Sequence, residues 1–201
     1  MNMDSEPQNT DDALNDYVYW LAGSDEFSQK GTGICFAART SGLYRSEDGG
    51  LTWHPAYASL GINEPLPTMA VATPGDFETE QSVFAGVIGG ILRSRDGGIS
   101  WESIQLPAPP PAIVAMIASP NYPQDGMLFA GTMEDGVLCS ADRGRHWVAW
   151  NFGLFDLNVL CFGISPNFAS DETLFAGTQT GLFRSTNGGR AWREVDLPIG
   201  F

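Results

Sequence analysis

Eight residues recur four times along this chain, and their spacing constrains the fold more than any other feature of the sequence. The copies are SEDGGLTW at 46–53, SRDGGISW at 94–101, SADRGRHW at 140–147 and STNGGRAW at 185–192. Their final tryptophans are separated by 48, 46 and 45 residues. Such regular spacing indicates that one supersecondary unit is repeated and stacked against its neighbours.

The similarity between the repeats extends upstream of this pattern. The preceding segments are FAARTSGLYRS at 36–46, FAGVIGGILRS at 84–94, FAGTMEDGVLCS at 129–140 and FAGTQTGLFRS at 175–185. Each unit predicts four short strands separated by turns rich in Gly, Pro, Asn and Asp. In the last unit we expect strands over 159–165, 174–178, 182–185 and 192–195; the first unit begins with strands over 17–22 and 34–38. Four-stranded antiparallel sheets with this period describe the blades of a β-propeller.

The repeats cover nearly the whole chain from about residue 17. We therefore predict an all-β propeller over 14–201, with four blades at about 14–56, 66–106, 112–151 and 157–198. Residues 1–29 hold seven acidic residues and no basic one. The first 13 residues are polar, so we expect 1–13 to be a flexible acidic arm in solvent.

The eight-residue pattern resembles the Asp-box, or BNR repeat, written S-x-D-x-G-x-T-W. This repeat occurs in sialidases, sortilin-type propellers, some glycoside hydrolases and photosystem assembly factors. The first copy matches throughout, with Ser46, Asp48, Gly50, Thr52 and Trp53. The second and third copies keep Ser94, Asp96, Gly98 and Trp101, and Ser140, Asp142, Gly144 and Trp147. The fourth keeps Ser185, Gly189 and Trp192. The later copies depart from the pattern at a few positions. Ser100 in the second copy and His146 in the third replace Thr, and Arg143 in the third replaces the first Gly of the turn. In the fourth copy, Asn187 replaces Asp and Ala191 replaces Thr.

The residue types in this pattern suit a structural turn between the third and fourth strands of a blade. A short carboxylate accepts hydrogen bonds from backbone amides inside a turn, and glycine allows positive φ. The tryptophan buries a large ring between blades while its indole N–H finds an acceptor nearby. Four copies spread around a ring do not converge on one site, so we interpret the carboxylates as structural rather than catalytic or calcium-binding.

Charge and composition restrict the partners. The chain has 24 Asp and Glu against 10 Lys and Arg, a net charge of −14, which disfavours nucleic-acid binding. No apolar run is long enough to span a membrane, and no secretory signal is visible. The three cysteines, Cys35, Cys139 and Cys161, lie far apart in apolar stretches. We expect them to be buried in a reducing compartment, with the cytoplasm as the default location.

The sequence offers few of the residue groups that catalysis requires. A sialidase needs an arginine triad, but Arg45, Arg93 and Arg184 occupy equivalent repeat positions and belong to the scaffold. A glycosidase needs two carboxylates about 5–10 Å apart, one with a raised pKa; the candidates are Glu64, Glu134, Asp135 and Asp156. The sequence shows no arrangement typical of a catalytic nucleophile, no spacing typical of metal ligands and no cofactor-binding motif. We therefore predict a protein that is not an enzyme and has no metal or cofactor.

A binding surface is better supported, on the rim opposite the repeated turns. The loops between second and third strands and the linkers between blades should meet there. Two linkers, 55–67 and 150–157, are unusually apolar, and 106–112 is rich in proline. The candidate rim residues are Arg39, Tyr57, Glu64, Glu134, Asp135, Phe152, Phe155 and Asp156. Some of these aromatic side chains will instead pack between blades.

We predict a scaffold that mediates protein–protein interaction or complex assembly through this loop rim. The alternative is a carbohydrate-binding or glycosidase/sialidase-like propeller, or a fragment of one. Propellers hold four to eight blades, and these four leave no strand to complete a blade from both chain ends. We expect an open arc completed by a second copy as an eight-bladed homodimer, by further repeats or by another protein. The alternative is a four-bladed ring closed by one chain.

Overall fold

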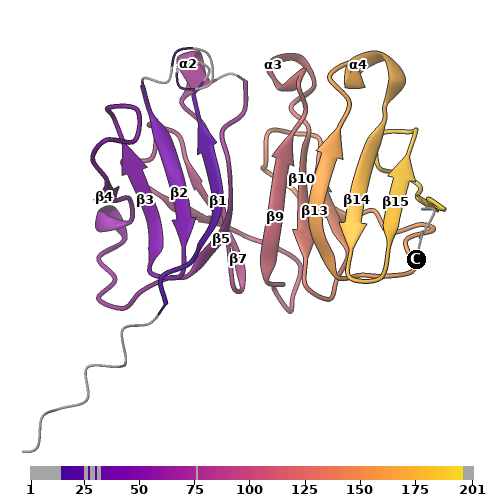
Figure 1. The fold of residues 1–201 in the computed structure, drawn as a ribbon, viewed down its shortest axis with the longest axis horizontal. Helices are drawn as coiled ribbons and strands as arrows, with labels where there is room; N and C mark the ends of the chain where they lie inside the picture. The colour runs from indigo at the N-terminus through magenta and orange to yellow at the C-terminus, as the bar shows by residue number, and fades with distance from the viewer. Residues whose placement is uncertain (1–14, 25–26, 28–29, 31–32, 76, 197–201) are drawn as a thin grey trace, which may run out of the picture.

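The computed structural model describes residues 15–24, 27, 30, 33–75 and 77–196. The strands in this part of the chain form four antiparallel sheets of four strands each (Figure 1). Every sheet takes its strands in sequence order. The predicted all-β class and its four-stranded blades are confirmed, and we number the blades 1 to 4 along the chain. The acidic arm predicted over 1–13 lies outside the described residues.

Each blade runs from a long innermost strand to a short outermost one. Blade 1 holds β1 (Val18–Gly23), β2 (Cys35–Arg39), β3 (Gly42–Ser46) and β4 (His54–Pro55). Blade 2 holds β5 (Thr68–Ala72), β6 (Val83–Val87), β7 (Gly90–Ser94) and β8 (Glu102–Ile104). Blade 3 holds β9 (Ile113–Ala118), β10 (Leu128–Thr132), β11 (Val137–Ser140) and β12 (Val148–Ala149). Blade 4 holds β13 (Val159–Ile164), β14 (Leu174–Thr178), β15 (Leu182–Ser185) and β16 (Arg193–Glu194).

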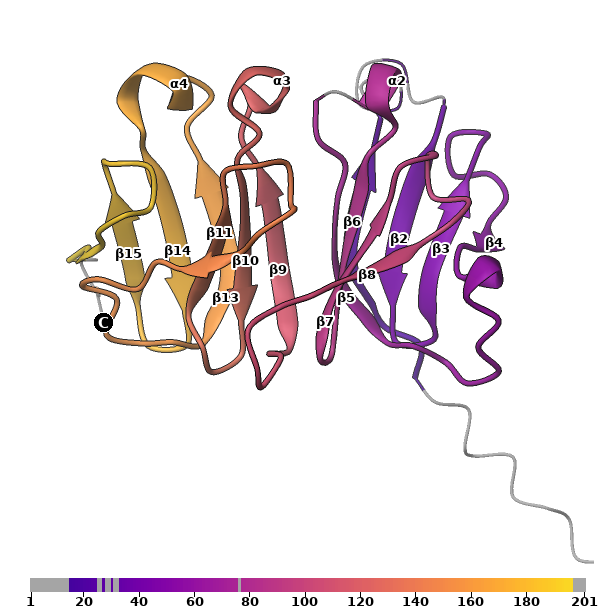
Figure 2. The same cartoon turned by 180° about the vertical axis from the view of Figure 1, so that it is seen from behind.

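The four blades form an open arc. The innermost strands β1, β5, β9 and β13 lie side by side in that order, and β1 forms no comparable contact with β13 within the described residues. Blades 1 and 4 extend to opposite sides of the view in Figure 1. The outer strands of blades 2 and 3 come forward when the molecule is seen from behind (Figure 2).

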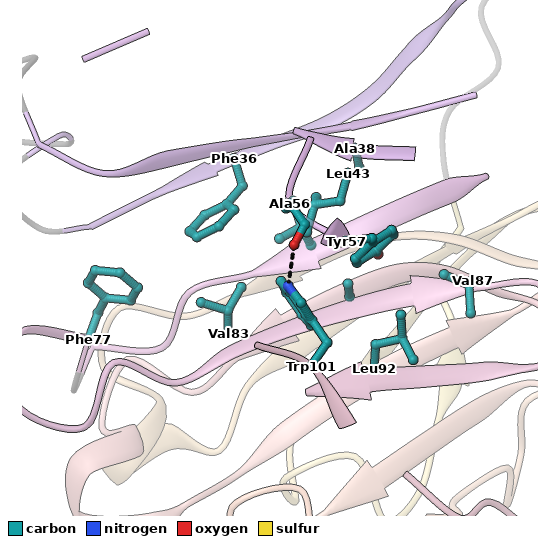
Figure 3. Close-up of a cluster of buried hydrophobic side chains, with 12 residues drawn as sticks. Phe36, Ala38, Leu43, Ala56, Tyr57, Phe77, Val83, Val87, Leu92 and Trp101 are labelled. Atoms are coloured by element: carbon teal, nitrogen blue, oxygen red, sulfur yellow. Dashed lines mark hydrogen bonds between the residues drawn. The ribbon is translucent and has the colours of Figure 1, made fainter. Parts of the chain in front are cut away.

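The hydrophobic core lies between consecutive blades rather than within any one of them. Between blades 1 and 2, Phe36 and Leu43 meet Val83, Leu92 and Trp101 (Figure 3). Two further clusters fill the spaces between blades 2 and 3 and between blades 3 and 4. Each sheet therefore buries its apolar side chains only against its neighbours, as repeat folds do.

Short helical turns cap the loops between the first and second strands of three blades. They are α2 (Phe77–Glu80), α3 (Tyr122–Asp125) and α4 (Phe168–Asp171), and each begins with a buried aromatic residue. A 3-10 turn, η1 (Ala58–Leu60), lies in the linker after blade 1. None of the helices in the described part of the chain is long and apolar enough to cross a membrane.

The strand bounds follow the sequence expectations closely. The predicted strands 174–178 and 182–185 coincide with β14 and β15. The first strands of blade 1 are displaced by one residue, to 18–23 and 35–39. The last predicted strand, 192–195, shrinks to the two residues of β16, because Trp192 belongs to the turn and Val195 to the end of the sheet.

Candidate functional site

The repeated pattern folds as the hairpin between the third and fourth strands of each blade. In blade 1, Oδ1 of Asp48 accepts hydrogen bonds from the amides of Leu51 and Thr52 at 3.1 and 2.9 Å. Its Oδ2 accepts the Thr52 hydroxyl at 2.6 Å. The Ser46 hydroxyl donates to Asp48 at 2.7 Å and accepts the amide of Gly50 at 2.8 Å. The same network recurs in blade 2 at Ser94, Asp96, Gly98 and Ser100.

The altered copy in blade 3 keeps the backbone part of this network, and the copy in blade 4 keeps it except at Arg190, whose amide donates to the carbonyl of Asn187. In blade 3, Nδ1 of His146 lies 2.5 Å from Oδ2 of Asp142, so the imidazole takes the place of the hydroxyl. In blade 4, Oδ1 of Asn187 accepts the Ser185 hydroxyl and the amide of Ala191, each at 2.9 Å. Ala191 has no side-chain donor, so the hydroxyl arm is missing from the fourth turn.

Hydrogen bonding holds the turn carboxyl groups in their ionised form. Burial opposes the charge on Asp96 and Asp142, but the donors of these turns outweigh it and lower each pKa to about 2. Bonds from Thr52 and Ser46 likewise hold the pKa of Asp48 well below its usual range. A carboxyl with such a low pKa is a poor general acid at neutral pH, so this chemistry suits a turn rather than catalysis.

In blades 2 and 4 the tryptophan of the pattern joins its turn to the linker that precedes its blade, whereas Trp53 and Trp147 donate within their own turns. The indole nitrogen of Trp101 donates to the carbonyl oxygen of Ala56 at 3.0 Å (Figure 3). Trp192 donates in the same way to Trp150 at 2.8 Å. Trp101, Trp147 and Trp192 are buried, whereas Trp53 in blade 1 is only partly buried.

The two ends of the blades form two different rims. The repeated turns share one rim with the helical turns, since the amides of Gly97 and Gly188 donate to the carbonyls of Gln81 and Glu172. The other, which we call the loop rim, combines the loops at 40–41, 88–89, 133–136 and 179–181 with the linkers 56–67, 105–112 and 150–158. Backbone hydrogen bonds such as Gly136 N to Leu157 O at 3.0 Å join these loops to the linkers. The loop rim is therefore opposite the repeated turns, as expected.

A pocket of about 330 Å³ lies on the loop rim at blade 3. Its wall combines the proline-rich linker with the ends of the blade and the next linker: Pro107, Ala108, Pro109, Pro111, Asp135, Leu138, Ala149, Asn151 and Leu157. The Asn151 side chain accepts the amide of Val137 and donates to the carbonyl of Asp135, both at 2.8 Å, so it is satisfied within the protein. The remaining wall is mostly apolar, which suits an apolar side chain of a ligand.

One predicted rim residue, Asp135, lines this pocket, and three others lie near wall residues in the sequence. The carboxylate residues Glu134 and Asp135 are exposed in the loop between β10 and β11. Phe152 and Phe155 lie in the linker between the wall residues Asn151 and Leu157, and they are 81% and 84% exposed. The amide of Trp192 donates to the carbonyl of Phe152 at 2.8 Å, so this part of the linker lies against the turn of blade 4. The pocket itself has a negative charge in its wall at Asp135.

The other predicted rim residues have structural partners or lie elsewhere. Arg39 pairs with Asp16 at 2.7 Å. Asp156 accepts the amide and hydroxyl of Thr180, both at 2.7 Å, and these bonds lower the pKa of Asp156 to about 2. Glu64 lines a smaller pocket of about 170 Å³ at blade 1, together with Tyr44 and Ile62.

Tyr57 is placed in the core instead of on the rim surface. Its ring meets Trp101 edge to face, with centroids 5.4 Å apart. Its hydroxyl lies 2.9 Å from Oγ1 of Thr68, which satisfies the polar end and allows the side chain to be buried. Burial raises the pKa of this phenol above its usual range.

The prediction that all three cysteines are buried is wrong for one of them. Cys35 and Cys139 are buried, and burial raises the pKa of Cys139 to about 12. Cys161 on β13 is exposed, because no further blade covers that face. Among the described residues, no group of His, Cys, Asp and Glu is arranged to hold a metal ion.

Sequence reasoning singled out the linkers of the loop rim but missed most of the pocket wall. Pro107, Pro109, Leu138, Ala149 and Asn151 were not among the candidate residues. The proline-rich segment at 106–112 was the available signal. Leu138 and Ala149 come from paired strands β11 and β12, and nothing in their local sequence distinguishes them from other strand residues.

The comparisons with known proteins found similar structures but no matching sequence family. No family model and no curated protein matches the sequence. An ancestral GH74 enzyme superposes with a TM-score of 0.69 at 22% identity, over 90% of this chain and 24% of that one. The GH74 xyloglucanase from Xanthomonas campestris gives 0.64 at 19%, over 88% and 30%. YCF48 bound to D1 peptide gives 0.63 at 18%, over 89% and 52%.

This chain thus spans about a quarter to a half of the length of these structures. At such identities the likeness concerns the fold alone, and it is the same in enzymes and in a peptide-bound protein. Together with the four radiating sheets, it identifies the chain as a β-propeller protein.

Proposed function

We propose that this chain is a non-enzymatic Asp-box propeller that binds a protein segment on its loop rim. The bound segment would place an apolar side chain in the pocket between the proline-rich linker and Leu157. It would carry a basic residue next to that side chain, opposite Glu134 and Asp135. The shared geometry of the four turns would serve only to hold the rim loops in place.

One observation carries this proposal: the linker that supplies Asn151 and Leu157 to an apolar pocket also holds two phenylalanines that stand almost fully in solvent. Phe152 and Phe155 are 81% and 84% exposed and flank wall residues of the 330 Å³ pocket. Exposed aromatic side chains mark interaction surfaces, because their burial on binding is favourable. The acidic margin would select among apolar partners by charge.

The electrostatics of the chain give less support to glycoside hydrolysis. That reaction needs a carboxylic acid whose pKa is raised, paired with a second carboxylate. In the described residues, every carboxyl group with a clear pKa shift is shifted downward, including Asp96, Asp142 and Asp156. Glu64 and Asp135 line different pockets, so they do not form a pair.

The neighbours are consistent with more than one function for such a propeller. YCF48 bound to D1 peptide is a peptide-bound propeller with this blade architecture. The GH74 structures make carbohydrate binding the competing candidate.

A random peptide library displayed on phage tests the proposal. Immobilised protein should enrich peptides that contain an aromatic or aliphatic residue next to Lys or Arg. Phe155→Ser should weaken binding of an enriched peptide at least tenfold, and Asp135→Asn should weaken it less and reduce its salt dependence. Ile99→Ser is the matched control, because Ile99 is also exposed but lies in a repeated turn on the opposite rim.

Two results would contradict the proposal. One is a library that yields no enriched peptide, or peptides whose binding is unchanged by Phe155→Ser. The other is saturable binding of xyloglucan oligosaccharides that is lost on Phe155→Ser, which would assign the same surface to carbohydrate.

A further inference from the structure

Every contact between consecutive blades uses the same pair of residues. Phe36, Phe84 and Phe129 are fully buried, and each lies across the second glycine of the next blade's turn. A Cβ on Gly98 would be 2.5 Å from Cε1 of Phe36, and a Cβ on Gly189 would be 2.9 Å from Cε1 of Phe129. A Cβ on Gly144 would be still closer to Cε1 of Phe84. These glycines therefore admit the aromatic ring of the neighbour.

A second contact repeats beside the first. A Cβ on Gly86 would lie 2.6 Å from Ile113, the first residue of the innermost strand of the next blade. A Cβ on Gly131 would lie 2.8 Å from Val159 at the equivalent position. The last two junctions thus share the close approach of a β-strand glycine to the next innermost strand, whereas Ala38 occupies the equivalent position at the first junction.

Blade 4 presents the first half of this interface, and no other blade packs against it in the part of the chain that the structure describes. Phe175 pairs with Arg184 across the sheet, as Phe36 pairs with Arg45 and Phe84 with Arg93, so these phenylalanines are equivalent. Phe175 is nevertheless partly exposed. A hollow of about 500 Å³ opens on the same blade, lined by residues that include Arg184, Ala191, Arg193 and Val195.

Blade 1 presents the second half, and among the described residues no other blade covers it. Val18 is 55% exposed, although its counterparts Thr68, Ile113 and Val159 are fully buried. Leu21 is 63% exposed, whereas its counterparts Val71 and Met116 are buried. Gly50 has only its own Trp53 and Cys35 within 4 Å of a would-be Cβ, so no aromatic ring from another blade lies on this turn.

We propose that blade 4 of one copy packs against blade 1 of a second copy, and that two such contacts close an eight-bladed ring. Phe175 would lie on Gly50 of the second copy, and Gly177 would approach its Val18. Trp53 of the second copy would enter the hollow of blade 4, and its indole would donate to the carbonyl of Val195. This bond would repeat those from Trp101 to Ala56 and from Trp192 to Trp150.

The second copy is the occupant that the two faces specify. Both halves of one interface are present on the same chain, so a twofold axis matches each with its complement. The two end blades extend to opposite sides (Figure 1), so the two uncovered faces lie at opposite ends of the molecule, where a second copy can meet both. Eight blades fall within the range of closed propellers.

A disulfide placed in the proposed contact tests it directly. The variant combines Val18→Cys with Gly177→Cys in the full 201-residue chain, with Cys161→Ala to remove the exposed native thiol. The control combines Gly131→Cys with Val159→Cys in the same background. In the control the two Cβ positions are 3.1 Å apart, near the lower limit of about 3.5 Å for disulfides. Cys35 and Cys139 are buried and should not react.

The proposal predicts that mild oxidation converts the Val18→Cys/Gly177→Cys protein to one covalent dimer on non-reducing gels. The control should form its disulfide within one chain and remain at the monomer mass. A ladder of larger species would show open head-to-tail growth and overturn ring closure. A monomer in which the two introduced thiols are linked within one chain, or no link while the control oxidises, would overturn the dimer.

A substitution on the wild-type surface provides an independent check. Phe175→Glu should abolish the dimer in size-exclusion chromatography with light scattering, while the thermal melt of the monomer remains cooperative. Ile99→Glu adds the same charge at an exposed turn residue and should leave the dimer intact. A Phe175→Glu protein that stays dimeric would overturn the proposed contact. These tests do not involve the loop rim, so their outcome is independent of the proposed binding function.

Discussion

The indole nitrogen of Trp192 donates a 2.8 Å hydrogen bond to the carbonyl oxygen of Trp150, which lies 42 residues earlier in the chain. Trp101 makes the equivalent bond to Ala56. Each bond fastens the turn of one blade to the linker from the preceding blade. The repeated pattern thus stabilises the junctions between blades as well as the turns themselves.

Trp192→Phe should therefore lower the free energy of unfolding by about 1–3 kcal/mol, because the carbonyl of Trp150 loses its donor. Trp147→Phe is the matched change, since Trp147 is equally buried but donates only to its own turn at 3.2 Å. Urea unfolding of both variants measures the difference. A loss for Trp147→Phe as large as that for Trp192→Phe would contradict the junction role.

The turn network makes a similar prediction at Asp96. Asp96→Ala removes the acceptor for the amides of Ile99 and Ser100, and should cost about 1–3 kcal/mol. Asn187→Asp restores a carboxylate in blade 4, where Ser185 and the amide of Ala191 already donate to the side chain. It should be neutral or mildly stabilising. Unchanged thermal melts for Asp96→Ala would refute the turn role of the carboxylate.

Acid should weaken the fold through the same groups. The pKa values of Asp96 and Asp142 are about 2 in the folded protein, against about 3.9 in an unfolded chain. The unfolded chain therefore binds more protons in this interval, so the free energy of unfolding falls as the pH drops from about 4 to about 2.

Urea unfolding at a series of pH values measures this slope, and Asp96→Asn should reduce it by the share of one carboxyl group. An Asp96→Asn protein with the pH dependence of the wild type would show that the Asp96 carboxyl does not contribute.

The purified protein should not hydrolyse xyloglucan, aryl glycosides or a fluorogenic sialoside above the rate of a blank. The reason is the absence, among the described residues, of a carboxyl group with a clearly raised pKa to act as the acid. Reducing-sugar and fluorescence assays measure the rate. Turnover that disappears with Glu134→Gln or Asp135→Asn would assign an enzymatic role to the rim.

The sequence predicted the blades well because the strand and turn signals repeat in phase. Segments such as 174–178 and 182–185 are bounded by Gly, Asn and Asp on both sides, which leaves little freedom for their ends. The helical turns were missed because one turn of helix has no periodicity to detect. Their signal was the recurring aromatic residue, Phe77, Tyr122 or Phe168, in loops that otherwise read as polar.

The binding surface was harder to predict because burial depends on neighbours outside the local sequence. Tyr57 lies in an apolar linker like Phe155, yet it is buried because Thr68 and Trp101 provide partners for its hydroxyl and ring. Asp156 is an acidic residue in a linker of the loop rim, but the amide and hydroxyl of Thr180 in the adjoining loop donate hydrogen bonds to it. Cys161 is exposed only because blade 4 ends the arc.

Sedimentation equilibrium of the unmodified 201-residue chain tests the central claim, that blade-to-blade packing continues between copies at the ends of the arc. The account predicts one species of twice the 21.7 kDa chain mass, which dissociates on Phe175→Glu. A single monomeric species at micromolar to tens of micromolar protein would contradict it, because Phe175, Val18 and Leu21 would then remain uncovered in the native state.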